Sequence, residues 1–475
     1  MAASAVKPAR IKKDINFTSG PLFVPILLFT LPILATGVLQ FLYNAADTLI
    51  VSNFAQDGKT ALAAVSSTGA LSNLITGLFI GLSVGASVTL SHSLGAGHKE
   101  EANDVVHTAI TMAAGLGIIV AIFGFFASKP LLLLMSTPET VIEHSSLYMK
   151  IIFLGMPAQM VYNYGAALLR AKGDTKRPLY FLIISGAVNV SFNMLFVIGF
   201  HLDVAGVALA TIISQYLSAT LVINRLCRLD DECKLDLRHL RVSRYLLSKI
   251  IKIGIPAGLQ GCLFSFSNVL IQSSVNSFGD IAMAGNGAAA QIDGLLYIAL
   301  NSFYHAAITF SGQNLGAKET KRVRRTCYYC LSLVMIVGIP ICLLAFFFGE
   351  QILGIYLPES TADKAAVIEY GMIRMGYMSR TYFLCGLMEV MSGMLRGLGA
   401  SLTSMFVSLV GACGLRVVWI YTIFAWNRTP GTLYLSFPLS WFATTLGLYI
   451  CYAIILRRIE RGFENIAPPE HHKGA

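Results

Sequence analysis

Charged residues are scarce in this chain of 475 residues. Asp, Glu, Lys and Arg together make up 13% of the sequence, whereas hydrophobic residues make up 55%. Soluble domains carry roughly 25% charged residues, so the low charge and the mean hydropathy of +0.67 favour a protein surrounded by membrane lipid. The formal net charge of +10 comes from basic residues that lie between long apolar runs. We therefore expect no nucleic-acid partner.

Motifs for disulfides, metals and catalysis are also missing. The nine cysteines show no paired spacing and are typical of small buried apolar residues. Several lie inside apolar runs, at Cys262, Cys385 and Cys451. The histidines lack the spacing of a zinc site and are scattered at His92, His98, His107, His201 and His305. This pattern argues against an intramembrane enzyme, so we expect no catalytic residue and no cofactor.

Twelve apolar runs are long enough to cross a membrane as helices, because a span needs about 20 predominantly apolar residues. The first six predicted helices are 22–51, 61–91, 105–127, 146–169, 179–200 and 204–224. The second six are 246–278, 281–313, 327–348, 367–395, 402–426 and 432–456. The sequence thus predicts an all-α polytopic membrane protein.

The positions of Lys and Arg predict the orientation. Cytoplasmic loops carry an excess of these residues, and here the segment before the first helix and every second loop after it are basic. The opposite loops hold only Lys59, Lys129, Lys364 and Arg428. We therefore expect a multi-pass plasma-membrane protein with both termini in the cytoplasm.

Landmarks recur in the same order in the two halves. Leu94-Gly95-Ala96 returns as Leu315-Gly316-Ala317, and Leu169-Arg170 returns as Leu395-Arg396, at a nearly constant separation along the chain. Pro32 likewise matches Pro256. Six helices repeated in the same orientation predict a parallel repeat, which is a known transporter design. Two such bundles can rock about a shared cleft, so the architecture favours a transporter over a membrane enzyme or an assembly scaffold.

The repeat divides the chain into five expected segments. They are a cytoplasmic N-terminal segment (1–20), a first lobe (21–224), a basic cytoplasmic connector (225–245), a second lobe (246–456) and a cytoplasmic tail (457–475). We expect a monomer whose partner is a small-molecule substrate.

Polar side chains inside apolar spans are costly, and the ionisable ones are functional candidates. In the first helix, Gln40, Asn44 and Asp47 are spaced by four and three residues, which predicts one shared face. Carboxylate, amide and hydroxyl oxygens suit a hard cation, and a poorly hydrated carboxylate also takes up protons. The expected cation-coupling residues are Asp47, Asn44, Asn189, Asn193 and Thr211, with Na+ held at Asp47, Asn189 and Thr211 or H+ exchanged there. Helix-to-helix hydrogen bonding is the alternative role for the amides and the hydroxyl.

The second half has a different set of charges. The position that matches Asp47 is Ile271, and the acids within its spans are Asp293 and Glu389. A buried glutamate and arginine usually pair, so we expect Glu389 to pair with Arg416 and Asp293 to lie nearer the cleft. Whether that pair is structural or contacts the substrate stays open. The substrate-cleft candidates are Gln40, Asn163, Gln215, Asn268, Asp293, Glu389 and Arg416.

Short motifs follow one another in a characteristic order and spacing: Tyr43-Asn44-Ala45-Ala46-Asp47, Ala61-Leu62-Ala63-Ala64-Val65, Leu94-Gly95-Ala96, Leu169-Arg170, Gly206-Val207-Ala208 with Ala210-Thr211, and Gly393-Met394-Leu395-Arg396-Gly397. By these motifs the chain resembles, over residues 20–461, the multidrug and toxic compound extrusion (MATE) family of prokaryotic antiporters. It implies twelve spans in two lobes, alternating access, and export of cationic or amphipathic drugs against an inward flow of Na+ or H+.

The resemblance also implies an amino-terminal coupling site. In the branch that is most similar, it consists of a first-helix aspartate, a fifth-helix asparagine and aspartate, and a sixth-helix threonine. Asp47, Asn189 and Thr211 match by position, whereas Asn193 stands where the second aspartate is usual. The site would then hold one carboxylate. A second branch, with acids in the seventh and tenth helices, is not matched, since Cys385 takes the place of its tenth-helix acid.

A lipid or oligosaccharide-lipid flippase of the same superfamily is the alternative function. It predicts a strongly cationic cleft, whereas the spans embed few basic residues, namely Arg374, Arg380 and Arg416. A channel is a further alternative, but the sequence contains no repeated filter-like segment.

Overall fold

The computed structural model describes residues 17–54, 58–135, 137–357 and 363–465, and these ranges form helices without any strand. In chain order the helices are α1 (Phe23–Phe54), α2 (Gly58–Gly95), α3 (Lys99–Leu134), α4 (Glu139–Lys172), α5 (Lys176–Met194), the π-helical turn η1 (Leu195–Gly199), α6 (Asp203–Cys227), α7 (Arg244–Asn276), α8 (Asp280–Gly316), α9 (Thr320–Phe347), α10 (Gly349–Tyr356), α11 (Lys364–Tyr377), the 3₁₀ turn η2 (Ser379–Thr381), α12 (Phe383–Gly397), α13 (Ser401–Ser408), the π-helical turn η3 (Leu409–Gly414), α14 (Leu415–Trp419), the π-helical turn η4 (Ile420–Phe424) and α15 (Pro430–Glu464). The predicted all-α fold is confirmed.

Nine of the described helical segments are long and apolar enough to cross a membrane. Together with α4, α8 and the α11–α12 pair, they account for the twelve predicted helices. Two predicted helices are not uniform, because η2 interrupts 367–395 and the turns η3 and η4 lie within 402–426. Local sequence explains where the last helix begins: the Thr429 side chain accepts a hydrogen bond from the backbone N–H of Thr432, and Pro430 occupies the first turn.

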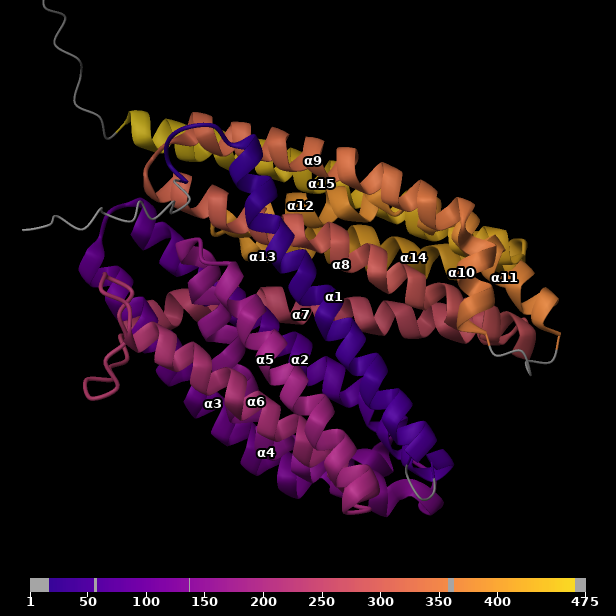
Figure 1. Cartoon of the computed structure of the whole chain (residues 1–475). Coiled ribbons are helices and arrows are strands. Elements are labelled where there is room, and N and C mark those ends of the chain that lie inside the picture. The colour runs from indigo at the N-terminus through magenta and orange to yellow at the C-terminus, as the bar shows by residue number, and fades with distance from the viewer. Residues whose placement is uncertain (1–16, 55–57, 136, 358–362, 466–475) are drawn as a thin grey trace, which may run out of the picture.

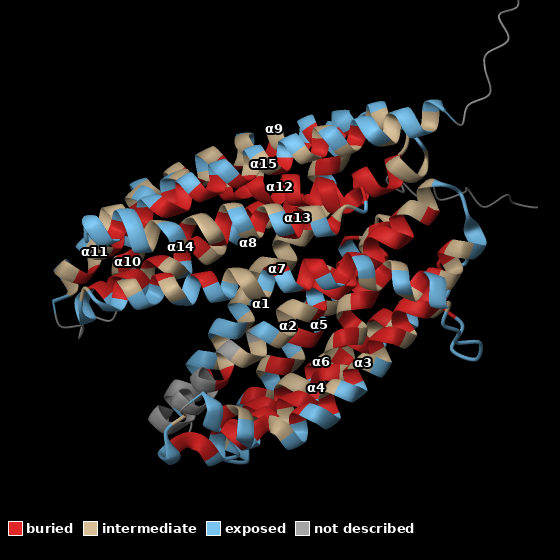
Figure 2. Cartoon of the chain, turned by 180° about the vertical axis from the view of Figure 1, so that it is seen from behind, coloured by how far each residue is buried: buried red, intermediate tan, exposed pale blue. Residues whose placement is uncertain are grey.

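The helices form two bundles, an N-lobe (α1–α6) and a C-lobe (α7–α15), which converge at one end and diverge toward the other (Figure 1). Each lobe has its own buried apolar core, which lies along the inward faces of its helices (Figure 2). The start of α1 and the end of α15 both lie at the converging end (Figure 1). The lobes therefore meet at the end that carries the ends of the described chain.

Two helices, α1 and α7, pack against both lobes. Phe29, in the first half of α1, belongs to the C-lobe core, whereas Tyr43 in the second half packs on α5. The relation is reversed in α7, where Ile250 belongs to the N-lobe core and Ile271 to the C-lobe core. Each of these helices contains an internal proline, a residue that removes one backbone hydrogen bond and bends a helix. The lobes are thus joined by two crossing helices in related positions.

Glycines allow the backbones of α2 and α7 to touch between the lobes. Gly81 and Gly85 on α2 face Gly254 and Gly258 on α7. A Cβ on Gly81 would lie 2.2 Å from the backbone nitrogen of Gly258, and one on Gly85 would lie 2.2 Å from the carbonyl oxygen of Ile250. Small residues four apart are typical of close helix pairs in membranes. Any side chain at these positions would push the lobes apart.

Candidate functional site

A carboxylate and two amides meet inside the N-lobe. Asn193 on α5 donates one hydrogen bond through Nδ2 to Asp47 Oδ1 (2.5 Å) and a second to Asn189 Oδ1 (3.2 Å). Asn189 and Asn193 are buried, and Asp47 on α1 is half-buried. The spacing of four residues along α5 brings the two amides onto one face. Three of the predicted coupling residues are therefore in contact.

One oxygen of this cluster has no partner. Asn193 Oδ1 is buried and, among the described residues, accepts no hydrogen bond, which is costly for a polar atom away from water. A flip that exchanges the amide nitrogen and oxygen would turn this oxygen toward Asp47. The flipped amide would then need a cation, or a proton on Asp47, between the two oxygens. The donor set, which consists of carboxylate and amide oxygens, suits a hard monovalent cation or a proton.

Two other predicted members of the site are placed elsewhere. Asn44 is exposed, as is Gln40, so the predicted polar face of α1 does not enter the site as a whole. The reason is the contact with α5, which is centred on Tyr43 and Asp47 and leaves the neighbouring strip of α1 outside. Thr211 is half-buried and donates to the carbonyl oxygen of Val207 in its own helix (2.9 Å).

The N-lobe candidates Asn163 and Gln215 are half-buried. Gln215 packs its side-chain oxygen against Gly155, and this oxygen is buried without a hydrogen-bond partner in the described part of the chain. Neither residue lines the cavity of the C-lobe that is described below. The structure therefore gives them no shared site with the C-lobe candidates.

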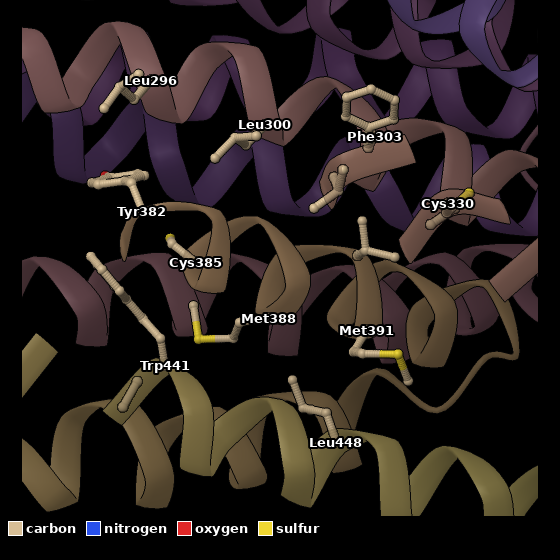
Figure 3. Packing of buried hydrophobic residues seen from close by; sticks show 14 of the residues in the cluster. Leu296, Leu300, Phe303, Cys330, Tyr382, Cys385, Met388, Met391, Trp441 and Leu448 are labelled. Atoms are coloured by element: carbon tan, nitrogen blue, oxygen red, sulfur yellow. The ribbon is translucent and has the colours of Figure 1, made fainter. Parts of the chain in front are cut away.

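A cavity with a volume of about 560 Å³ lies in the C-lobe. Its walls include four predicted cleft residues, Asn268, Asp293, Glu389 and Arg416. Aromatic and sulfur-containing side chains line much of the rest, and Figure 3 shows Tyr382, Cys385, Met388 and Trp441 gathered between α12 and α15. A volume in this range is typical of pockets for drug-sized molecules.

Asp293 is engaged in a buried network on the cavity wall. Arg374 donates to its Oδ2 from Nε (3.0 Å) and Nη2 (2.9 Å), and Ser379 donates to its Oδ1 (2.8 Å). Arg374 also donates to Asn286 Oδ1 (2.5 Å), which accepts a further bond from the Tyr434 hydroxyl (3.1 Å). The interruption of the helix at η2 places Ser379 beside the acid. Both charges are thus paired and hydrogen-bonded.

The expected ion pair between Glu389 and Arg416 is not formed. Among the described residues, no ion pair involves either side chain, although both line the same cavity. Arg416 instead donates from Nε to the Ser440 hydroxyl (2.9 Å) and stacks over the Phe437 ring, with 4.2 Å between the guanidinium carbon and the ring centroid. The acid that does pair with an arginine is Asp293, so the predicted roles of the two acids are corrected.

Comparison with known proteins identifies the family. The MatE family model matches residues 32–195 and 256–422, which together cover more than half of the chain. The chain belongs to the MatE family. The two matched segments each cover most of one lobe, in agreement with the repeat of six helices.

Characterised relatives of this MatE-family chain are transport proteins. It is 27% identical to the probable multidrug resistance protein YoeA of Bacillus subtilis, over 91% of this chain and 93% of that protein. It is 24% identical to a protein named FAD transporter from Shewanella oneidensis, over 71% of this chain and 75% of that protein. Among solved structures, the outward-facing conformation of a multidrug resistance MATE transporter is similar, with a TM-score of 0.87, 19% identity, and coverage of 94% of this chain and 99% of that one. The chain is therefore a multi-pass membrane transporter of this family.

Several residues of the hydrogen-bonded network around Asp293 escape prediction from the sequence. Asn286, Ser379 and Tyr434 are common residue types with no local motif. For Arg374, the available signal was that it is one of the few basic residues within the apolar spans. Non-α turns adjoin both sites, because η1 begins two residues after Asn193 and η3 ends two residues before Arg416. Such turns are frequent at functional positions.

Proposed function

We propose that this MatE-family transporter is an antiporter that exports small organic molecules by alternating access, driven by inward flow of H+ or Na+ at Asp47. The observation that carries the proposal is the contact between Asp47 and Asn193, together with the buried and unpartnered Asn193 Oδ1. An acid within a span that has no basic partner is available to an ion. Among the described residues, no ion pair involves Asp47.

Ion binding at Asp47 supplies the coupling by a simple route. The carboxylate is on α1, whose first half is packed in the C-lobe, while its amide partners are on α5 of the N-lobe. A cation or proton at this contact stabilises the packing of α1 on α5, and its loss weakens that packing. Because α1 spans the two lobes, this difference favours one arrangement of the lobes over the other, which is all that coupling requires.

The orientation of the lobes in the membrane is inferred from the basic loops. The basic loops lie at the converging end, so we infer that this end is cytoplasmic and that the lobes open toward the outside. The similarity to a structure described as outward-facing supports this assignment. Relatives named as multidrug resistance proteins support export of drug-like molecules. Function as a monomer in the plasma membrane remains part of the proposal.

The flippase alternative receives less support from the cavity. A strongly cationic cleft was its expectation, but the cavity wall carries two acids, Asp293 and Glu389, and two arginines, Arg374 and Arg416. These formal charges balance. The cavity therefore lacks the excess of positive charge that a pyrophosphate-linked lipid would need.

The test is transport in proteoliposomes with an imposed H+ or Na+ gradient, each applied separately. Asp47→Asn should bind the substrate yet fail to drive its uphill export, because the amide keeps the shape but not the charge. Glu143→Gln is the matched control, since that acid is exposed on the same lobe and pairs with Lys129. Normal gradient-driven export by Asp47→Asn would show that the coupling group lies elsewhere.

A further inference from the structure

Arg416 is a buried cation that lacks an anionic partner. Its side chain is 5% exposed, and Nε is bonded to the neutral hydroxyl of Ser440. The guanidinium lies over Phe437 and within 5.9 Å of the Trp441 ring centroid. Within the described ranges, no carboxylate lies within ion-pair distance of it.

Such an arginine is unfavourable unless an anion completes its surroundings. A guanidinium stays protonated in proteins, and an unpaired charge in a poorly hydrated interior is costly. Stacking on the aromatic rings compensates for part of this cost. The planar fork of the guanidinium is also shaped for two parallel hydrogen bonds to a carboxylate or phosphate.

Among the charged residues of the cavity wall, Arg416 is the candidate for binding an anion. Asp293 and Arg374 satisfy each other within their network. Glu389 lines the same cavity but, among the described residues, forms no ion pair with Arg416. Arg416 therefore faces an aromatic cavity of about 560 Å³ with no carboxylate at ion-pair distance.

We propose that the C-lobe cavity binds an aromatic or amphipathic organic anion, whose carboxylate or phosphate group is held by Arg416 while its ring packs against Trp441 and Tyr382. The inference rests on the proposed function only in treating this ligand as a transport substrate. The binding test below needs no ion gradient, so its outcome is independent of the Asp47 experiment.

The probes are 7-diethylaminocoumarin-3-carboxylate and its 3-carboxamide, which differ in one negative charge. Fluorescence titration of the purified full-length protein should give at least about tenfold tighter binding of the carboxylate. Arg416→Gln should remove this preference and Arg416→Lys should keep part of it, whereas Arg428→Gln, at an exposed arginine that does not line the cavity, should leave it in place. Melting curves of each variant establish that it is folded.

Three outcomes would overturn the proposal. The first is equal or tighter binding of the carboxamide by the unmodified protein. The second is a carboxylate preference that survives in folded Arg416→Gln. Titrations in chloride and in gluconate distinguish an organic ligand from a small inorganic anion. Chloride would be the ligand if it displaced the coumarin probe fully at the lowest chloride concentrations used and the protein bound the two coumarins equally. That result would also refute an organic anion as the ligand.

A separate set of contacts carries a second inference, which concerns the converging end of the lobes. His92 Nε2 on α2 donates to the carbonyl oxygen of Gly397 at the end of α12 (2.7 Å). Gln313 Nε2 on α8 donates to the carbonyl oxygen of Ala171 at the end of α4 (2.7 Å). Each bond joins one lobe to the other, and each is made by a side chain to a backbone oxygen.

The internal repeat relates these two bonds to each other. The donors His92 and Gln313 are as far apart along the chain as the repeated Leu94 and Leu315. The acceptors Ala171 and Gly397 are likewise as far apart as the repeated Leu169 and Leu395. The backbones beside them also meet in related pairs. A Cβ on Gly95 would lie 1.9 Å from the Gln313 carbonyl oxygen, and one on Gly316 would lie 2.2 Å from the His92 carbonyl oxygen.

The geometry assigns these two bonds to a symmetric latch that holds the converging end closed and that must break when the lobes exchange access. Each bond requires the two lobes in register, and neither is replaced by another contact within a lobe. A side chain-to-backbone hydrogen bond contributes about 0.5–1.5 kcal/mol, so the loss of either one should increase opening of this end about two- to tenfold.

Hydrogen–deuterium exchange of the full-length protein tests the latch in segments 88–96 and 309–316. His92→Ala and Gln313→Ala should each accelerate exchange in both segments, because one opening exposes both. His92→Gln should restore slow exchange, since glutamine makes the equivalent bond in the other half. His107→Ala is the control, because His107 bonds to the Asn103 carbonyl oxygen in its own helix and to the Asp236 backbone N–H in the connector, and neither bond reaches the C-lobe. The latch is refuted if His92→Gln exchanges as fast as His92→Ala, or if each alanine variant affects its own segment alone.

Discussion

Replacing Asp293 by Asn should destabilise the C-lobe far more than replacing Glu389 by Gln, although both acids line the same cavity. Arg374 donates two hydrogen bonds to Asp293 Oδ2, at 2.9 and 3.0 Å, and its side chain is 11% exposed. Asp293→Asn would leave this buried guanidinium without an anionic partner. Breaking a buried pair in this way costs about 3–5 kcal/mol.

The expected cost for Glu389→Gln is much smaller. In the described structure Glu389 accepts no hydrogen bond and forms no ion pair, so its replacement removes no direct contact. The change in free energy of unfolding should stay below about 1 kcal/mol, the size of a single typical hydrogen bond. Two substitutions of similar chemistry in one cavity are therefore expected to differ by several kcal/mol.

The assay is reversible unfolding in mixed micelles, combined with a double-mutant cycle. Asp293→Asn and Arg374→Gln should each be strongly destabilising, and the double variant should recover part of the loss. The coupling energy should lie between about 0.5 and 3 kcal/mol, the range for residues in contact. A cycle of Glu389→Gln with Arg416→Gln should be additive. Additive effects in the first cycle, or coupling in the second, would refute this account of the cavity.

Two further predictions concern packing and orientation. Gly85→Ala should destabilise the protein because its Cβ would lie 2.2 Å from a backbone oxygen of α7, whereas Gly115→Ala, where a Cβ meets open space, should be neutral or stabilising in thermal unfolding. A cysteine at Asp363 should react with a membrane-impermeant maleimide added to intact cells, and a cysteine at Lys321 should not. The opposite labelling would invert the assigned orientation.

The division into helices and the two related halves could be predicted from the sequence because both depend on long-range composition. Apolar runs separated by basic loops define spans whatever their detailed packing. Interruptions of the helices could not be placed in this way. The turn η2 lies within an apolar run around Ser379, and its position depends on a hydrogen bond to Asp293, which is 86 residues away along the chain. Pairing at that separation leaves no periodic signal.

The candidate ion site shows the same limit on a smaller scale. The spacing of Asn189 and Asn193 predicted correctly that they share a face, and the structure brings Asn193 to Asp47 and Asn189 to Asn193. The similar spacing of Asn44 and Asp47 did not place Asn44 in the site. Only some of the residues on one face of a helix contact a given neighbouring helix. In the contact of α1 with α5, the Tyr43 ring lies against Gly186. Which residues of the face enter the site therefore depends on the partner helix.

The internal repeat shows how two lobes of the same fold carry different sites, one at Asp47 and one at Asp293. When the halves are aligned so that Leu169 matches Leu395, the position of Arg374 corresponds to Tyr148 in the N-lobe. Tyr148 packs among the apolar residues around the end of α1, near Asp47. A neutral phenol thus stands where the C-lobe has the arginine that pairs with Asp293. In the part of the chain that the structure describes, Asp293 is neutralised by a neighbouring arginine and Asp47 is not. Of these two acids, Asp47 is consequently the one that an external cation or proton can reach.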